Sequence, residues 1–265
     1  MPLVEYDKDF LINLAADSRN RACLLAVMLI HSGDWLQVAP LTAAGLRMDN
    51  AVVRVAASLR LGTSICAAHI CQCGSSVDTS GTHGLSCSAS AGRISRHSAL
   101  NDIIHRALIR AQVNATKEPL GLVPGSGLRP DGVTLIPWST GKCLAWDVTV
   151  PDTLASSHLP TTSTLVGAAA SNAARLKRQK YAMLESSHII MPVAVETLGT
   201  WDADSLRFIR DLGRRLTLVT GDRHETSFLL QRLSVAIQRG NAAACLGSLP
   251  SHVVDYINDA HDCPL

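Results

Sequence analysis

The chain has 265 residues, of which 47% are hydrophobic and 17% charged, a composition typical of folded rather than disordered proteins. This length suits one large domain, or one medium domain with appendages. The longest apolar run, ACLLAVMLI at residues 22–30, is too short to cross a bilayer, and we expect no membrane partner. The amino-terminal MPLVEYDKDF carries acids where a signal peptide would be basic, which indicates an intracellular protein. The net charge of +2 is too small to indicate nucleic-acid binding by itself.

The first 62 residues are predicted to form a helical leader or connecting region. Apolar residues recur at helical spacing over residues 9–30, which predicts a helix or a helical pair. A second short helix is predicted over residues 52–61. The stretch that follows, residues 65–92, is rich in Cys, Gly and Ser and shows no periodicity, so something other than a hydrophobic core must order it.

A Cys/His cluster in this stretch, CQCGSSVDTSGTHGLSC, has residue types that bind zinc. The candidate ligands are Cys71, Cys73, His83 and Cys87. Four such ligands complete a zinc tetrahedron, and binding energy can then fold a segment that lacks apolar contacts. We therefore expect a structural zinc knuckle over residues 63–97, with no open coordination position for catalysis. Cys66 or His69 is an alternative ligand, and free cysteines in a loop are the alternative to a metal site.

From residue 98 onward the pattern changes to alternating helices and strands. A helix is predicted over residues 98–112. The predicted strands are residues 116–123, 131–137, 143–150 and 188–197, and the later helices are residues 165–185, 204–220 and 226–246. Turn signals, PGSG at 124–127 and STGK at 139–142, separate the first three strands. The order helix, three strands, helix, strand, helices is that of an α/β sandwich, which we place at residues 98–248, before a tail at residues 249–265.

Two aspartates lie in these otherwise apolar strands. A hairpin centred on Ser139 places Asp131 opposite Asp147, with the Cβ atoms about 5 Å apart. Two buried carboxylates at that separation are unfavourable unless one is protonated or a cation lies between them. Mg²⁺ prefers carboxylate oxygens and water, and can assist attack on a phosphate. The alternative is structural: Asp131 caps a turn and Asp147 pairs with a helix arginine.

Three further residues bear on this hypothesis. Glu118, in the preceding strand, is a candidate third acid, or else an exposed side chain. A lysine two residues beyond Asp147 would supply positive charge, but the chain has Thr149 there. We therefore expect Lys180, in the helical KRQKY segment, to take that role.

Basic residues gather in local patches that can meet phosphates. The candidate DNA-binding residues are Arg93, Arg96, His97, Arg129, Arg175, Lys177 and Arg178. The alternative is that these residues form solvated helix faces.

The series of motifs resembles a known family. RPD, a hairpin and then WDVT resemble the PD-(D/E)XK nuclease superfamily. One group within this superfamily is more closely similar over residues 66–197. The shared order is a Cys/His knuckle, RHSALNDIIHRAL, KEP, RPDG, WDVTV and a basic helix. That group is the carboxy-terminal zinc knuckle and restriction-like endonuclease region of non-LTR retrotransposon polyproteins. The Thr149 position departs from the wider superfamily.

The resemblance implies a fold and an activity. The fold would be a restriction-endonuclease-like α/β core (helix, three-strand meander, helix, strand) with a helical amino-terminal region and a small zinc knuckle. The activity would be metal-dependent nicking of target DNA with Mg²⁺ or Mn²⁺. DNA would be the main partner, element RNA and a reverse transcriptase domain of the parent polyprotein would be further partners, and the location would be nuclear. A non-catalytic zinc-containing nucleic-acid-binding module, or an inactive retroelement remnant, is the alternative.

Overall fold

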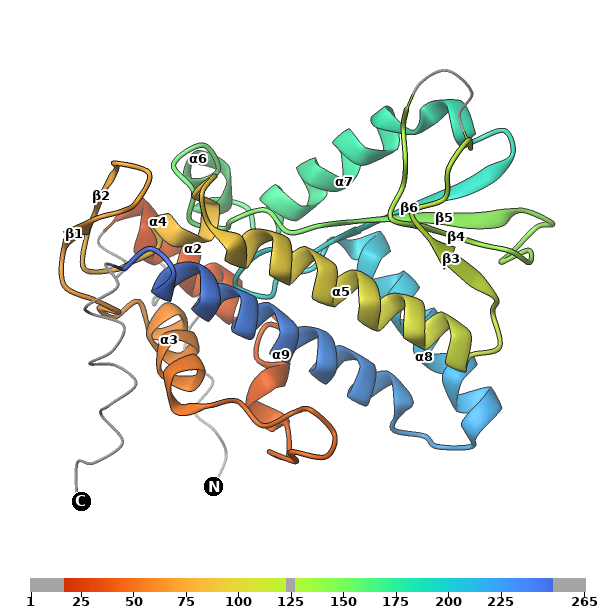
Figure 1. Cartoon of the computed structure of the whole chain (residues 1–265), viewed down its shortest axis with the longest axis horizontal. Coiled ribbons are helices and arrows are strands. Elements are labelled where there is room, and N and C mark those ends of the chain that lie inside the picture. The colour runs from red at the N-terminus through yellow and green to blue at the C-terminus, as the bar shows by residue number, and fades with distance from the viewer. Residues whose placement is uncertain (1–16, 123–126, 250–265) are drawn as a thin grey trace.

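A computed structural model describes residues 17–122 and 127–249 (Figure 1). Within these ranges the protein is mixed α/β, with eight α-helices, a four-stranded sheet and a separate two-stranded sheet. The helices are α2 (Ser18–Val27), α3 (Asn50–Leu61), α4 (His83–Ser86), α5 (Ala91–Arg110), α6 (Leu159–Thr162), α7 (Ala168–Lys180), α8 (Ala203–Thr220) and α9 (Glu225–Leu246), with 3-10 turns η1 (Asp34–Gln37) and η2 (Ala182–Leu184).

The larger sheet has the strand order β3-β4-β5-β6. Its strands are β3 (Ala115–Lys117), β4 (Gly132–Thr134), β5 (Cys143–Thr149) and β6 (His188–Ala194). The first three strands are antiparallel neighbours, and β6 pairs with β5 in parallel. A parallel pair needs a crossover connection, and the chain supplies it with α6 and α7 between β5 and β6.

Helices cover both faces of this sheet (Figure 1). Side chains alternate along a strand, and Leu144, Trp146 and Val148 of β5 join the main core with residues of α5, α8 and α9. On the other face, Ala170 and Ala174 of α7 pack against β6. The alternate residues of β5, Asp147 among them, therefore face α7.

The helical leader and the Cys-rich segment both pack against α9. One buried cluster joins residues of α2, α3 and α4 to the carboxy-terminal half of α9. The helix α9 also contacts α5 and α8 (Figure 1). In the described part of the chain, one long helix thus packs against all three expected regions, which are residues 1–62, 63–97 and 98–248.

The observed elements differ from the expected ones mainly at their ends. The helix α5 begins at Ala91 rather than at residue 98, so the knuckle runs into it directly. The strand expected over 116–123 is only three residues long, because the backbone turns into the left-handed region at Glu118, with φ of 48°. Parts of three expected features lie outside the described residues: the first helix (residues 9–16), the strand and turn at 123–126, and the tail (residues 250–265).

Candidate functional site

The β4–β5 hairpin has the register that a centre at Ser139 predicts. Gly132 pairs with Trp146 and Val133 pairs with Ala145, and Asp131 directly precedes Gly132 just as Asp147 directly follows Trp146. The backbone N–H of Val148 donates to Asp131 Oδ2 at 2.6 Å. Both carboxylates therefore belong to one small region at the end of the hairpin.

A close fit between two residues sets this register. A Cβ on Gly132 would lie 2.0 Å from Trp146 Cζ2, so the indole occupies the space of the missing side chain. The Trp146 indole N–H donates to Asn101 Oδ1 at 2.8 Å, and the Asn101 amide donates to the Asp131 carbonyl at 3.3 Å. The core helix α5 thereby fixes the backbone that carries Asp131.

Asp147 is a buried carboxylate, only 4% exposed. Lys177 Nζ lies 2.5 Å from its Oδ1, and the Tyr181 hydroxyl donates to its Oδ2 at 2.5 Å. The Tyr181 hydroxyl is also 3.0 Å from the Arg129 carbonyl. Burial, and then the negative charge of Asp131, raise the pKa of Asp147, while Lys177 opposes the rise. The geometry holds two carboxylates near each other with one ammonium beside them.

His97 of α5 contacts the other carboxylate. Its Nε2 lies 2.9 Å from Asp131 Oδ2. The hydrogen bond with Asp131 raises the pKa of His97, against the lowering effect of burial. His97 was expected to touch DNA, and the structure makes it a neighbour of the aspartate pair.

The structure corrects the expectation for Lys180 and shows where Glu118 lies. Lys180 does not take the place beside Asp147; its ammonium lies 4.8 Å from the centre of the Tyr181 ring, and Lys177 holds that place. Glu118 is 60% exposed at its side chain and forms an ion pair of 3.2 Å with Arg129, so its carboxylate is turned to that arginine.

Sequence reasoning missed Lys177 and Tyr181, and the feature that marks them is the buried face of α7, which the structure defines. The buried residues Ala170 and Ala174 of α7 define a stripe at helical spacing, and positions 177 and 181 continue it in steps of three and four. Lys180 falls beside this stripe. The side chain that could reach the sheet was therefore the lysine in register with the alanines.

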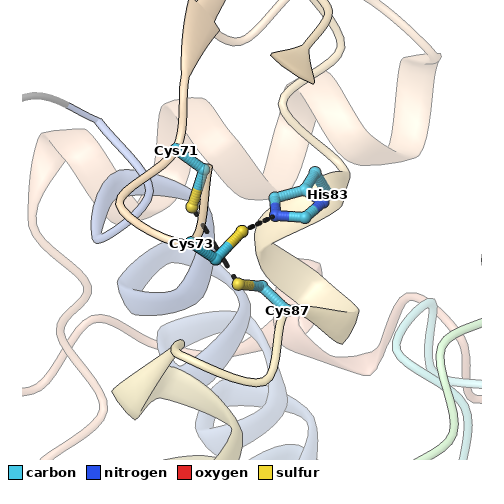
Figure 2. Close-up of side chains that lie close together, drawn as sticks. All are labelled: Cys71, Cys73, His83 and Cys87. Carbon is cyan, nitrogen blue, oxygen red and sulfur yellow. Dashed lines mark hydrogen bonds between the residues drawn. The ribbon is translucent and has the colours of Figure 1, made fainter. Parts of the chain in front are cut away.

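The Cys/His cluster comes together as expected (Figure 2). The ligand atoms of Cys71, Cys73, His83 and Cys87 all lie within 4.8 Å of one another. Cys73 Sγ is 3.2 Å from His83 Nε2, and Cys71 Sγ is 3.9 Å from Cys87 Sγ. Ligand atoms on a tetrahedral zinc stand roughly 3.5–3.8 Å apart. This group could hold a metal ion, and its donor set is compatible with structural zinc.

Local geometry explains the cluster. The strands β1 (His69–Ile70) and β2 (Ser76–Val77) form a hairpin whose tight turn carries the first two cysteines. Gly74 supplies φ of 85° in this turn, which a glycine adopts without strain. Hydrogen bonds from Ser75 lower the pKa of the Cys73 thiol to about 6, which favours the thiolate that a metal requires. Cys66, the alternative ligand, lies outside the group, with its Sγ 3.8 Å from His69 Nδ1.

Two glycines and a buried arginine pack the segment that carries the cluster against α9. A Cβ on Gly84 would lie 2.3 Å from the Ala244 carbonyl oxygen, and a Cβ on Gly92 would lie 2.4 Å from the Ala244 nitrogen. Arg96 donates to Asn241 Oδ1 at 2.7 Å and to the Leu85 carbonyl at 3.2 Å. Arg96 is 2% exposed. The expectation that it contacts DNA is wrong, because its guanidinium is enclosed between α4, α5 and α9.

The other expected DNA-binding residues divide into two groups. Arg93 and Arg175 are exposed and bond to groups near them in the chain, Arg93 to the Ser86 carbonyl and Arg175 to an amide on its own helix. Arg129, Lys177 and Arg178 pair with acids: Arg129 with Glu118, Lys177 with Asp147, and Arg178 with Asp204 at 2.6 Å.

No protein-family model matches the chain, and no curated protein matches it either. Within residues 17–122 and 127–249, no helix combines the length and apolar character needed to cross a membrane.

Proposed function

We propose that the chain is a divalent-metal-dependent DNA endonuclease with a restriction-endonuclease-like core. In this proposal Asp131 and Asp147 hold Mg²⁺ or Mn²⁺, and Lys177 is the catalytic lysine. The contact of Lys177 with Asp147 is the observation that supports this proposal most strongly. Lys177 supplies to the aspartate pair the positive charge that Thr149 cannot supply.

The donor set fits a divalent cation. Two carboxylates lie at neighbouring positions of the hairpin, and the charge of Asp131 raises the pKa of buried Asp147. A cation bound between them would relieve that repulsion, and carboxylate oxygens with water are the ligands that Mg²⁺ prefers. When bound, such an ion would orient water and offset negative charge on a phosphate.

The chain's own residues would orient and charge this site. Tyr181 holds Asp147 Oδ2, and His97 holds Asp131 Oδ2. The Lys177 ammonium, 27% exposed at its side chain, can reach an attacking water or the phosphate, where it would stabilise developing negative charge. His97 and Tyr181 are positioning residues in this proposal.

The zinc knuckle would be structural. It contacts the start of α5 and the end of α9, and Arg93 is an exposed cation near it. We propose DNA as the substrate, on the resemblance to the retroelement nucleases. The proposal includes origin from a non-LTR retrotransposon, element RNA and a reverse transcriptase domain as further partners, and a nuclear location.

The experiment is nicking of supercoiled plasmid with Mg²⁺ or Mn²⁺. The intact, zinc-loaded chain is compared with Asp131→Asn, Asp147→Asn and a matched control, Asp211→Asn, an acid on α8 that pairs with Arg214. We expect nicking by the intact chain and the control, and a loss of at least about 100-fold in the two site variants. Each variant is checked for folding by circular dichroism.

The alternative is a non-catalytic nucleic-acid-binding module or an inactive remnant, which the threonine at position 149 favours. A folded, zinc-loaded chain that binds plasmid without nicking it would support the binding module. A chain that neither binds nor nicks would support the remnant.

A further inference from the structure

A groove of about 1560 Å³ lies on the side of α5 that does not face the aspartates. Its walls are α5, α9 and the segment 42–50. Along α9 it extends from Glu225 to Ala243, which is about 27 Å at 1.5 Å per residue. The two helices run side by side in Figure 1, so the groove follows their common length.

Arginines on the groove outnumber the acids available to neutralise them. The arginines are Arg47, Arg106, Arg110, Arg232 and Arg239, all exposed. Arg110 pairs with Glu225 at 2.6 Å. Arg239 donates to the Arg47 carbonyl at 2.6 Å. In the described part of the chain, only Arg110 among the five has a carboxylate partner.

Two of the four acids on the groove, Glu225 and Asp102, pair with a cation, and the other two accept hydrogen bonds from residues near them in the chain. Asp102 pairs with Lys117 at 2.5 Å, and Asp222 accepts from His224. Asp49 caps α3, accepting from the Val52 N–H at 2.8 Å. The groove therefore offers four guanidiniums without a carboxylate partner, spread over three chain segments, against the two acids Asp49 and Asp222. This excess of positive charge complements a chain of phosphates.

An aromatic ring adds a second kind of contact. Phe228 lines the groove and is 45% exposed, one turn before Arg232 on α9. An exposed ring between cations is typical of surfaces that bind single strands, where it stacks on a base free of pairing. An acidic peptide would engage the arginines but has no base to stack on Phe228.

We propose that this groove binds single-stranded nucleic acid, with phosphates on Arg47, Arg106, Arg232 and Arg239 and a base on Phe228. The site is separate from the aspartate pair and does not rest on the nuclease proposal. The helix α5 carries both, with His97 toward Asp131 and Arg106 toward the groove.

The test is fluorescence anisotropy of labelled single strands of about 10 nucleotides, within the range typical of strand-binding sites. RNA and DNA of one sequence form two arms, in buffer without Mg²⁺. The zinc-loaded full chain is compared with Arg106→Ala/Arg232→Ala and with Arg207→Ala/Arg214→Ala, which removes equal charge from α8. We expect the groove pair to weaken binding roughly tenfold and to reduce the slope of log affinity against log salt by about 1.4, while the α8 pair changes neither.

Phe228→Ala tests stacking without a change of charge. We expect it to weaken single-strand binding and to leave both the salt slope and duplex binding unchanged. The proposal is overturned if neither strand binds, or if the α8 pair weakens binding as much as the groove pair. It is also overturned if a polyglutamate peptide binds the groove and the single strands do not. Binding by RNA, by DNA or by both, with the expected loss in the groove pair, supports it and identifies the strand.

Discussion

The Lys177 ammonium of α7 lies 2.5 Å from the Asp147 carboxylate of β5. These residues are 30 positions apart, and the strand position two residues beyond Asp147 carries Thr149. A helix crossing the sheet thus brings to the aspartate the positive charge that its own strand lacks. The proposed metal-dependent chemistry requires a positive charge near the aspartate pair, and here a different element of the fold supplies it.

We predict that Lys177 is essential for nicking and that Lys180 is dispensable. Lys177→Ala should lower the nicking rate by about 100-fold or more, because it removes the charge beside Asp147. Lys180→Ala is the matched control and should keep most of the activity, since its ammonium lies over the Tyr181 ring. Initial rates on supercoiled plasmid measure both. Equal losses in the two variants would contradict the assignment.

The Tyr181→Phe variant should show whether the Tyr181 hydroxyl orients the Asp147 carboxylate or whether the ring only packs in the core. The ring stays, but Asp147 loses the hydrogen bond from the hydroxyl, which also lies 3.0 Å from the Arg129 carbonyl. We expect nicking to fall about tenfold and the free energy of unfolding to fall by about 1–2 kcal/mol. A raised requirement for Mg²⁺, measured by metal titration, would mark the loss as one of carboxylate orientation. A stability loss with unchanged activity would make Tyr181 purely structural.

Zinc removal is predicted to destabilise the chain. Each chain should bind one zinc ion by atomic absorption, and chelation should lower Tm by roughly 10 °C, because metal binding energy contributes to folding. Cys87→Ser should lose the metal. Cys66→Ser should retain it, since Cys66 lies outside the group of four. Loss of zinc from the Cys66 variant alone would reverse the ligand assignment.

Arg96 is predicted to matter for folding rather than for DNA contact. Arg96→Ala should lower the free energy of unfolding by about 3 kcal/mol, since it leaves Asn241 and the Leu85 carbonyl without their buried partner. Arg93→Ala, on the exposed side of the same helix, should change stability by less than about 0.5 kcal/mol. Urea denaturation compares the two. A stable Arg96 variant with weakened DNA binding would restore the original expectation.

The buried Glu196 predicts a pH dependence of stability. Burial raises its pKa, although the N–H groups of Ala169 and Ala170 donate to it and oppose the rise. A carboxyl with a raised pKa in the folded state gives stability that is complete below its unfolded pKa. That stability is lost as the pH rises through the folded value. A tenfold difference between the folded and unfolded acid dissociation constants corresponds to about 1.4 kcal/mol.

The matched variant is Glu196→Gln, which keeps an acceptor for both N–H groups. We expect urea midpoints of the parent and the variant to converge near pH 4 and to diverge at pH 7, where the variant is the more stable. A parent that gains stability relative to the variant as the pH rises would contradict this.

Much of the fold followed from local patterns. The helices α3, α8 and α9 and the strands β5 and β6 were predictable because their apolar periodicities are strong and their ends carry turn residues. The shortness of β3 and the early start of α5 were not. The first depends on the backbone turn at Glu118, and the second depends on packing of Gly92 against α9.

The sequence by itself determined which residues could meet across the hairpin and which cysteines could share a metal. Strand register connects positions that are near in the chain, so counting residues was sufficient for Asp131 and Asp147. For the Cys/His group it left Cys66 and His69 open as alternative ligands, and the structure brings together Cys71, Cys73, His83 and Cys87. Only the tertiary structure decided that Lys177 rather than Lys180 lies at Asp147, and that Arg96 is buried. Those outcomes depend on how α7 and α9 dock, since the face that a helix turns inward is set by all its neighbours at once.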